Sequence, residues 1–304
     1  MDKPYYPIVH VTTKDKLTLY GLLQKSVNIS HKIIVNIHGT SGNFYCNNFY
    51  PYIAEVAYAN NFAYLQTNNR GYGNFAYEPG VVPHGAALEL FEDSIMDLDA
   101  WLKFCIDRGL DEIILESHSF GTEKVIYYLN KGKYRKNIIG VILLGFCDSV
   151  GTQERYEKKV GKSYFPEAKE LVSKGKGLSF LSDIFGGIAG EAPLSARSYL
   201  NFYSPGSELS KIMPLRLGKK LIMYSNINVP ILAIIGDNEE GEYAIIPIKK
   251  AIALMKKENP FTEAHQIINC DHAFNGKEKE LANLIERFLK KNYNAVTARD
   301  ADKK

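Results

Sequence analysis

Ser119 lies in the most distinctive short motif of the chain, which reads LESHSFG over residues 115–121. An apolar run precedes this motif, and a helical pattern, Thr122 to Leu129, follows it. A sharp turn from strand to helix can push a serine hydroxyl into solvent, provided that the residues two positions before and after it are small. Gly121 meets this condition, and Ser117 stands where the usual motif has glycine. The motif therefore predicts Ser119 as a nucleophile.

A serine hydroxyl is a poor nucleophile near neutral pH unless a base accepts its proton and an acid orients that base. Two later apolar runs end in residues of these types. Ile231 to Ile235 is followed by Asp237, and Gln266 to Ile268 is followed by His272. The order Ser, Asp, His along the chain is one in which such triads occur. We therefore predict His272 as the general base and Asp237 as the orienting acid.

Other carboxylates compete with Asp237 for the role of the acid. Asp148 follows the apolar run from Ile139 to Leu144 and is the main alternative. Glu239 and Glu240 lie in the same loop as Asp237, and Asp271 is adjacent to the histidine. We expect Asp271 to point away from the base.

Acyl transfer also needs donors for the oxyanion that forms on the carbonyl oxygen. The apolar run from Ile33 to Ile37 ends in HGTSGN, residues 38–43. We predict the backbone N–H groups of Thr40 and Phe120 as the two donors, with Gly39 allowing the chain to approach the substrate closely. His38 is interpreted as a packing residue rather than a base. Arg70, in a second glycine turn, is expected to make structural hydrogen bonds, with a position facing the pocket as the alternative.

The elements around these motifs predict the fold. Short, nearly continuous apolar runs are typical of strands that are buried on both faces of a parallel sheet. Helical patterns separate them, for example Leu88 to Leu102 and Ile245 to Met255, and an opening hairpin is expected over residues 8–23. This alternation favours an α/β fold with a doubly wound, mostly parallel sheet. We expect residues 1–150 and 226–294 to form its two parts, 151–225 a helical lid insertion, and 295–304 a disordered tail.

The expected lid lacks strand signals and is rich in glycine, serine and lysine. An insertion between two strands leaves the sheet at the edge where ligands bind. Some of its aromatic residues are therefore expected to line an apolar pocket over Ser119. Connecting helices without a functional role are the alternative. The aromatic residues in question are Tyr156, Tyr164, Phe165, Phe180, Phe185, Tyr199, Phe202 and Tyr203.

Composition excludes several classes of protein. The net charge of +3, from 37 basic and 34 acidic residues, gives no electrostatic case for binding nucleic acid. The four cysteines are far apart, so we expect buried thiols rather than a metal site, and no cofactor. Neither a secretory signal nor an apolar run long enough for a membrane span is present, which predicts a cytoplasmic protein. A homodimer is left open.

Taken together, these motifs resemble the α/β-hydrolase superfamily. HGTSGN, NRGYG, SHSFG, GDN and DHAF are similar, in order, to its oxyanion turn, second glycine turn, elbow, acid loop and histidine loop. A shorter similarity, at SARSYL over residues 195–200 and Ser204-Pro205-Gly206, is to the lid of a small cytosolic branch of unknown function common in fungi. The resemblance implies a hydrolase of esters, thioesters, lactones or amides.

The leading hypothesis is a serine hydrolase that cleaves a carboxylic ester of a small-molecule acyl substrate through an acyl-enzyme. An amide hydrolase or an acyltransferase would use the same machinery and stays open. A non-catalytic, ligand-binding member of the same fold is the alternative from another class.

Overall fold

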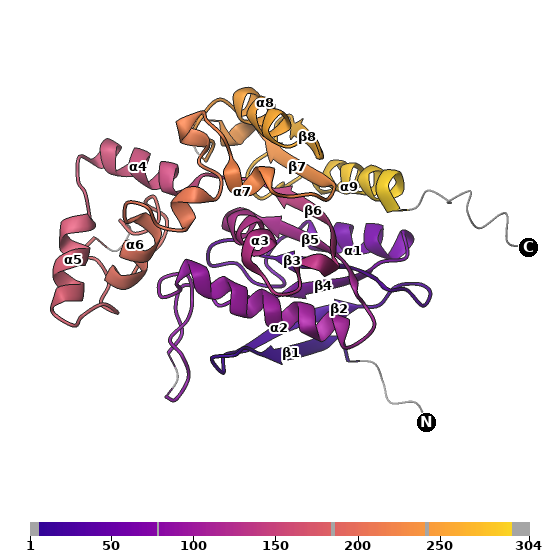
Figure 1. Cartoon of the computed structure of the whole chain (residues 1–304), viewed down its shortest axis with the longest axis horizontal. Coiled ribbons are helices and arrows are strands. Elements are labelled where there is room, and N and C mark those ends of the chain that lie inside the picture. The colour runs from indigo at the N-terminus through magenta and orange to yellow at the C-terminus, as the bar shows by residue number, and fades with distance from the viewer. Residues whose placement is uncertain (1–5, 78, 184–185, 241–242, 294–304) are drawn as a thin grey trace, which may run out of the picture.

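The computed structural model describes residues 6–77, 79–183, 186–240 and 243–293. An eight-stranded sheet runs through the molecule in the order β1-β2-β4-β3-β5-β6-β7-β8 (Figure 1). The pairs β1–β2 and β2–β4 are antiparallel, and the pairs from β4 to β8 are parallel. The strands are β1 (Ile8–Thr12), β2 (Thr18–Gln24), β3 (Lys32–Ile37), β4 (Ala63–Thr67), β5 (Glu112–His118), β6 (Ile138–Leu144), β7 (Ile231–Gly236) and β8 (Thr262–Ile267). The predicted doubly wound, mostly parallel sheet is confirmed.

Helices cover both faces of the sheet. Alternate residues of each central strand point to opposite faces, so both faces carry apolar side chains that must be covered. Ile33 and Val35 of β3 belong to one apolar core, whereas Ile34 belongs to the other. The first core is covered by α2 (Ser94–Ile106), α3 (Phe120–Lys131) and α8 (Ile248–Glu258). The second is covered by α1 (Tyr50–Ala59) and α9 (Glu278–Tyr293).

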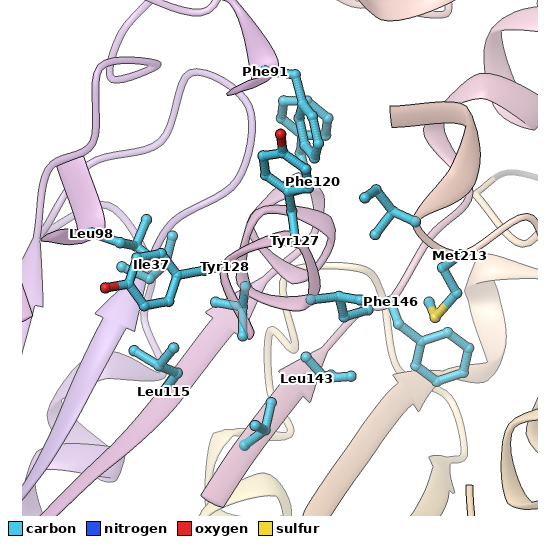
Figure 2. Close-up of a cluster of buried hydrophobic side chains, with 14 of the residues drawn as sticks. Ile37, Phe91, Leu98, Leu115, Phe120, Tyr127, Tyr128, Leu143, Phe146 and Met213 are labelled. Carbon is cyan, nitrogen blue, oxygen red and sulfur yellow. The ribbon is translucent and has the colours of Figure 1, made fainter. Parts of the chain in front are cut away.

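Packing over the central strands fixes where α3 begins. Figure 2 shows Tyr128 of α3 beside Leu115 of β5, with Phe120 and Tyr127 on the same helix. The ring of Phe91 lies 5.8 Å from that of Phe120 and 5.1 Å from that of Tyr127. Burial of each such aromatic side chain stabilises the fold by about 1.5–3 kcal/mol. The start of α3 is therefore anchored to the core, and the turn before it with it.

Several boundaries differ from the sequence prediction. The pattern from Leu88 to Leu102 becomes a short 3-10 turn, η1 (Phe91–Asp93), followed by α2. The strand before the serine continues as β5 to His118, past the last aliphatic residue. At the sheet edge β8 begins earlier than predicted and excludes Ile268, which is 58% exposed. Since an edge strand has only one neighbouring strand, fewer of its residues need to be apolar.

The insertion between β6 and β7 is mainly helical and projects to one side of the sheet in Figure 1. Phe185 and the tail, residues 295–304, lie outside the described residues. The helices and 3-10 turns of the insertion are α4 (Ser149–Val160), α5 (Phe165–Ser173), α6 (Ala196–Tyr203), η3 (Leu209–Lys211), η4 (Leu215–Leu217) and α7 (Ile222–Ser225). Two further 3-10 turns, η2 (Arg135–Asn137) and η5 (Asp237–Glu239), lie outside it.

Several smaller expectations can be compared with the structure. Cys105, Cys147 and Cys270 are buried thiols as expected, but Cys46 is exposed because it lies in the loop after β3. In the described ranges, no helix is long and apolar enough to span a bilayer. The same ranges contain no cluster of three or more metal-ligating side chains.

A buried carboxyl group lies between the central strands. Glu116 of β5 is opposite Asn36 of β3 and accepts hydrogen bonds from its Nδ2 atom, at 2.7 Å, and from the Tyr64 hydroxyl, at 3.2 Å. Oε1 of Glu116 and Oδ1 of Asn36 are buried without a hydrogen-bond partner. Burial raises the pKa of Glu116 to about 7. A proton on the carboxyl group would supply a donor between two acceptors that otherwise have none.

Candidate active site

Ser119 occupies the turn between β5 and α3 in a strained backbone conformation. Its φ of 55° and ψ of −129° lie in a region that residues with a side chain rarely adopt. The Ser119 N–H donates to the carbonyl of Leu144 at the end of β6, 2.9 Å away. Its carbonyl accepts from the N–H and hydroxyl of Thr122. These bonds hold the strained residue from both sides, as an elbow requires.

Neighbouring chain segments pack closely against this turn at two glycine positions. A Cβ atom added at Gly121 would lie 2.4 Å from the carbonyl oxygen of Ile37. One added at Gly39 would lie 2.7 Å from Cβ of Ser119. Only glycine fits at both positions, because real Cβ atoms essentially never approach other atoms so closely.

Ser117 stands where the usual motif has glycine, and its side chain is accommodated by a hydrogen bond. Its side chain is fully buried, and its hydroxyl donates to the carbonyl oxygen of Ile142 on β6, 3.2 Å away. A buried hydroxyl is tolerated when it finds an acceptor of this kind. The departure from the motif therefore leaves the left-handed turn at Ser119 in place.

The turn after β3, where the sequence predicts an oxyanion donor, is held by a histidine. Nδ1 of His38 donates to the carbonyl of Gly39 at 2.7 Å, and its Nε2 accepts from the N–H of Asn69 at 3.0 Å. Burial, reinforced by the Lys124 ammonium, lowers the pKa of His38 to about 3. The ring is thus neutral near pH 7 with both nitrogens engaged, which agrees with a packing residue. Thr40 follows directly and lines the same pocket as Ser119.

His272 is brought to the same edge of the sheet from the loop after β8. A Cβ atom added at Gly145, after β6, would lie 2.9 Å from its Cε1 atom. The ring of His118 lies 4.8 Å away, and Nε2 of His118 donates to the His272 carbonyl at 2.8 Å. Tyr243 stacks on the His272 ring, with ring centroids 4.1 Å apart and an interplanar angle of 16°. Burial lowers the pKa of His118 to about 3, so that ring is neutral.

The loop of Asp237 is bonded to the backbone of the histidine loop. Its Oδ1 accepts from the N–H of Cys270 at 3.0 Å, and the N–H of Asn238 donates back to the Cys270 carbonyl at 3.1 Å. These backbone bonds, first that to Cys270 and then that to Asn269, lower the pKa of Asp237. The carboxylate therefore supports the chain two residues before His272.

The competing carboxylates have other partners. Asp148 caps α4 by accepting from the Gly151 N–H at 3.0 Å, and it pairs with the Arg216 guanidinium at 2.6 Å. Asp271 accepts from Asn275, as expected for a side chain that points elsewhere. Glu240 accepts from the N–H of Ile248 at the start of α8, 3.2 Å away. The Glu239 side chain is outside the described part of the structure.

Arg70 is a structural residue. Its buried guanidinium lies 2.9 Å from Asp97, 3.1 Å from Asp15 and 3.2 Å from Asp93. This network ties the second glycine turn to the hairpin and to the start of α2, in agreement with the first of the two expectations for Arg70.

A small pocket of about 50 Å³ lies over Ser119. The core contributes Thr40, Phe120 and Cys147, and the insertion contributes Thr152 and Tyr203, among others. The full lining is Thr40, Ser119, Phe120, Cys147, Ser149, Thr152, Ile188, Ala189, Glu191, Tyr203 and Tyr243. No lysine or arginine is among these described lining residues, so the pocket offers no cation to an anionic substrate.

Tyr203 also lines a second cavity of about 280 Å³ within the insertion, together with Phe165 and Tyr199. The expectation that lid aromatics line a pocket thus has a structural counterpart in Tyr203. Other aromatics serve elsewhere: Phe202 is buried in the core, and Phe180 packs on Phe75 with ring centroids 5.6 Å apart.

Sequence reasoning missed a buried carboxyl group beside the pocket. Glu123, one turn after Ser119 on α3, accepts from the backbone N–H of Ser149 at 3.1 Å and from the Ser149 hydroxyl. Burial raises its pKa to about 8. The sequence feature that could have indicated this carboxyl group is a charged residue four positions after Ser119. Nothing in the sequence indicated that Tyr243 would stack on His272.

Comparisons with known proteins agree with this fold. An esterase of Pyrococcus furiosus superposes with a TM-score of 0.57 at 18% identity, covering 94% of this chain and 91% of that one. Est1E from Butyrivibrio proteoclasticus, with ferulic acid bound, gives 0.64 at 15% identity, covering 93% and 99%. The α/β hydrolase GrgF from Penicillium sp. sh18 gives 0.66 at 15% identity, covering 94% and 98%. The chain therefore has the α/β-hydrolase fold.

By sequence, the chain belongs to the family described as "Protein of unknown function (DUF1749)", which matches residues 92–290. No curated protein matches its sequence. At identities below one fifth, the structural neighbours establish the fold alone, and the chemistry must be argued from the site.

The close approach of Gly39 to Ser119 generates a prediction. Gly39→Ala should lower kcat for p-nitrophenyl acetate by about 10²-fold or more, because its methyl group would displace Ser119 or the oxyanion turn. Gly177→Ala is the matched control, since its nearest contact would be an ordinary 3.4 Å. Full activity in the Gly39 variant would contradict the assignment of this turn to the site.

Proposed function

We propose that this protein is a serine hydrolase that cleaves carboxylic esters through an acyl-enzyme intermediate. The observation that carries the proposal is the strained turn at Ser119, packed against Gly39 and beside the His272 loop at one sheet edge. Strain of this kind is expensive and is typical of functional residues. The esterases among the structural neighbours support the same class of reaction.

The proposed reaction has two halves. Ser119 Oγ attacks the ester carbonyl while His272 accepts the hydroxyl proton, and the oxyanion is stabilised by the N–H groups of Thr40 and Phe120. Phe120 is the first residue of α3, and the first N–H groups of a helix lack partners within it. His272 then protonates the departing alcohol. In the second half, His272 takes a proton from water, which attacks the acyl group and releases the acid, and Ser119 regains its proton.

Asp237 is proposed as the acid that orients His272. Its support is its position after β7 and its hold on the backbone of the histidine loop at Cys270. In the structure the hydrogen bonds of Ser119 within the described residues are made by its backbone. A bond between nucleophile and base often tightens only when substrate binds.

Residues 151–225 are proposed as a lid that selects the acyl group. Tyr203 lines both the pocket of about 50 Å³ over Ser119 and the cavity of about 280 Å³ within the insertion. Binding pockets for small molecules usually hold 300 Å³ or more, so the space over Ser119 suits a short acyl chain.

Ser119→Ala tests the nucleophile. Alanine keeps the Cβ atom and hence the backbone strain, so the fold should be retained while ester turnover falls by about 10⁴ to 10⁶-fold. Fluorophosphonate labelling, read by intact mass, should be lost as well. Ser225→Ala, which removes an exposed hydroxyl outside the pocket, should label fully. Labelling of the Ser119 variant would exclude it as the nucleophile.

Paired substitutions test the acid. Asp237→Asn should lower kcat by about 10² to 10⁴-fold, because it weakens the support of the base. Asp148→Asn should instead lower the free energy of unfolding by about 1–3 kcal/mol, since Arg216 loses its buried partner. Steady-state kinetics and urea unfolding separate the two effects. The reverse order of kcat losses would place the acid after β6.

Tyr203→Ala tests the lid. Removal of the ring should join the two cavities and raise kcat/KM for octanoate esters relative to acetate esters by about tenfold or more. Tyr203→Phe keeps the ring and should leave the chain-length profile of p-nitrophenyl esters unchanged. Identical profiles for the alanine variant and the wild type would remove Tyr203 as a determinant of specificity.

A further inference from the structure

A third hollow, far larger than the pocket over Ser119, lies between the end of the insertion and α8. It encloses about 880 Å³ and shares no lining residue with the pocket over Ser119. Its apolar side chains come from η4, α7 and α8, and two of them, Leu217 and Ile222, are 55% and 65% exposed. The apolar residues of this groove are Pro214, Leu217, Ile222, Met223 and Leu254. A volume in the ordinary ligand range with an apolar lining is typical of a binding site.

Cations surround this apolar groove. Lys211, Lys219, Lys220 and Lys257 line it, and Glu258 is the one acidic residue among its described lining residues. Lys211 is paired with Glu208 at 2.6 Å. The ammonium groups of the other three lysines form no ion pair with the described carboxylates. Glu258 accepts from the backbone N–H of Leu221 at 3.3 Å. The groove therefore presents three lysines without an ion pair and one carboxylate, an excess of positive charge beside an apolar floor.

We propose that this groove binds a single-chain anionic amphiphile, namely a long-chain carboxylate of the fatty-acid type. The alkyl chain would lie against Leu217, Ile222 and Leu254, and the carboxylate would meet one or more of the three lysines. The concave shape favours one chain inside the groove over a bilayer, which would need a protruding apolar surface. The positive charge of the groove disfavours cationic amphiphiles. This inference is independent of the function proposed for Ser119.

The test measures dodecanoate binding to the full chain by isothermal titration calorimetry. We expect one molecule to bind per chain, with dodecyltrimethylammonium binding at least about tenfold more weakly because its head group is repelled. Lys219→Glu/Lys220→Glu should weaken dodecanoate binding by about tenfold or more. Lys249→Glu/Lys250→Glu makes the same charge change at an exposed pair on α8 outside the groove, and should leave binding unchanged.

Two further binding measurements test where the ligand binds. Ile222→Glu places a negative charge on an exposed position of the groove, so it should weaken binding while circular dichroism shows an unchanged fold. Blocking Ser119 with a fluorophosphonate should leave binding unchanged. Loss of binding on that treatment would place the ligand over Ser119 and overturn the proposal. So would equal weakening by both lysine pairs, or binding to phosphatidylserine vesicles without binding to monomeric dodecanoate.

Discussion

The left-handed backbone at Ser119 is the constraint on which the rest of the site depends. A side chain can be held there only if the strand before it and the helix after it are both fixed, and the apolar packing of α3 on β5 and β6 provides this. The surrounding turns then come close enough to act together because Gly39, Gly121 and Gly145 carry no side chains. Polar groups reach one sheet edge through this packing, not through direct attraction to one another.

Much of this arrangement could be predicted from the sequence, because strand ends carry their functional residues with them. Once β5, β7 and β8 are recognised as parallel strands, Ser119, Asp237 and His272 must all follow the same edge. Contacts across loops could not be predicted, because no periodicity fixes the path of a loop. Tyr243 reaches His272 in this way, and Asp237 bonds to the backbone of Cys270.

The insertion is fastened to the core by two buried carboxyl groups. Asp148 stands just before its first helix and pairs with Arg216 near its far end, so the two ends are held together. Glu123, on the helix that begins directly after Ser119, bonds to Ser149 at the start of α4. The entropic cost of holding the two ends of an insertion together grows only slowly with the length of the insertion. The tip of the insertion can therefore vary in length. A movement of α4 would therefore be felt at the helix that carries the elbow.

The carboxyl group of Glu116 couples the folding of this protein to the uptake of a proton. Between about pH 4.5 and about 7 the side chain is ionised in the unfolded chain and protonated in the folded one, because burial raises its folded-state pKa. The folded state then holds more protons, so the free energy of unfolding falls as pH rises through this window, by at most about 1.4 kcal/mol per unit for one group. Mild acidity would thus strengthen the centre of the sheet, the opposite of the usual response of an ion-paired carboxylate.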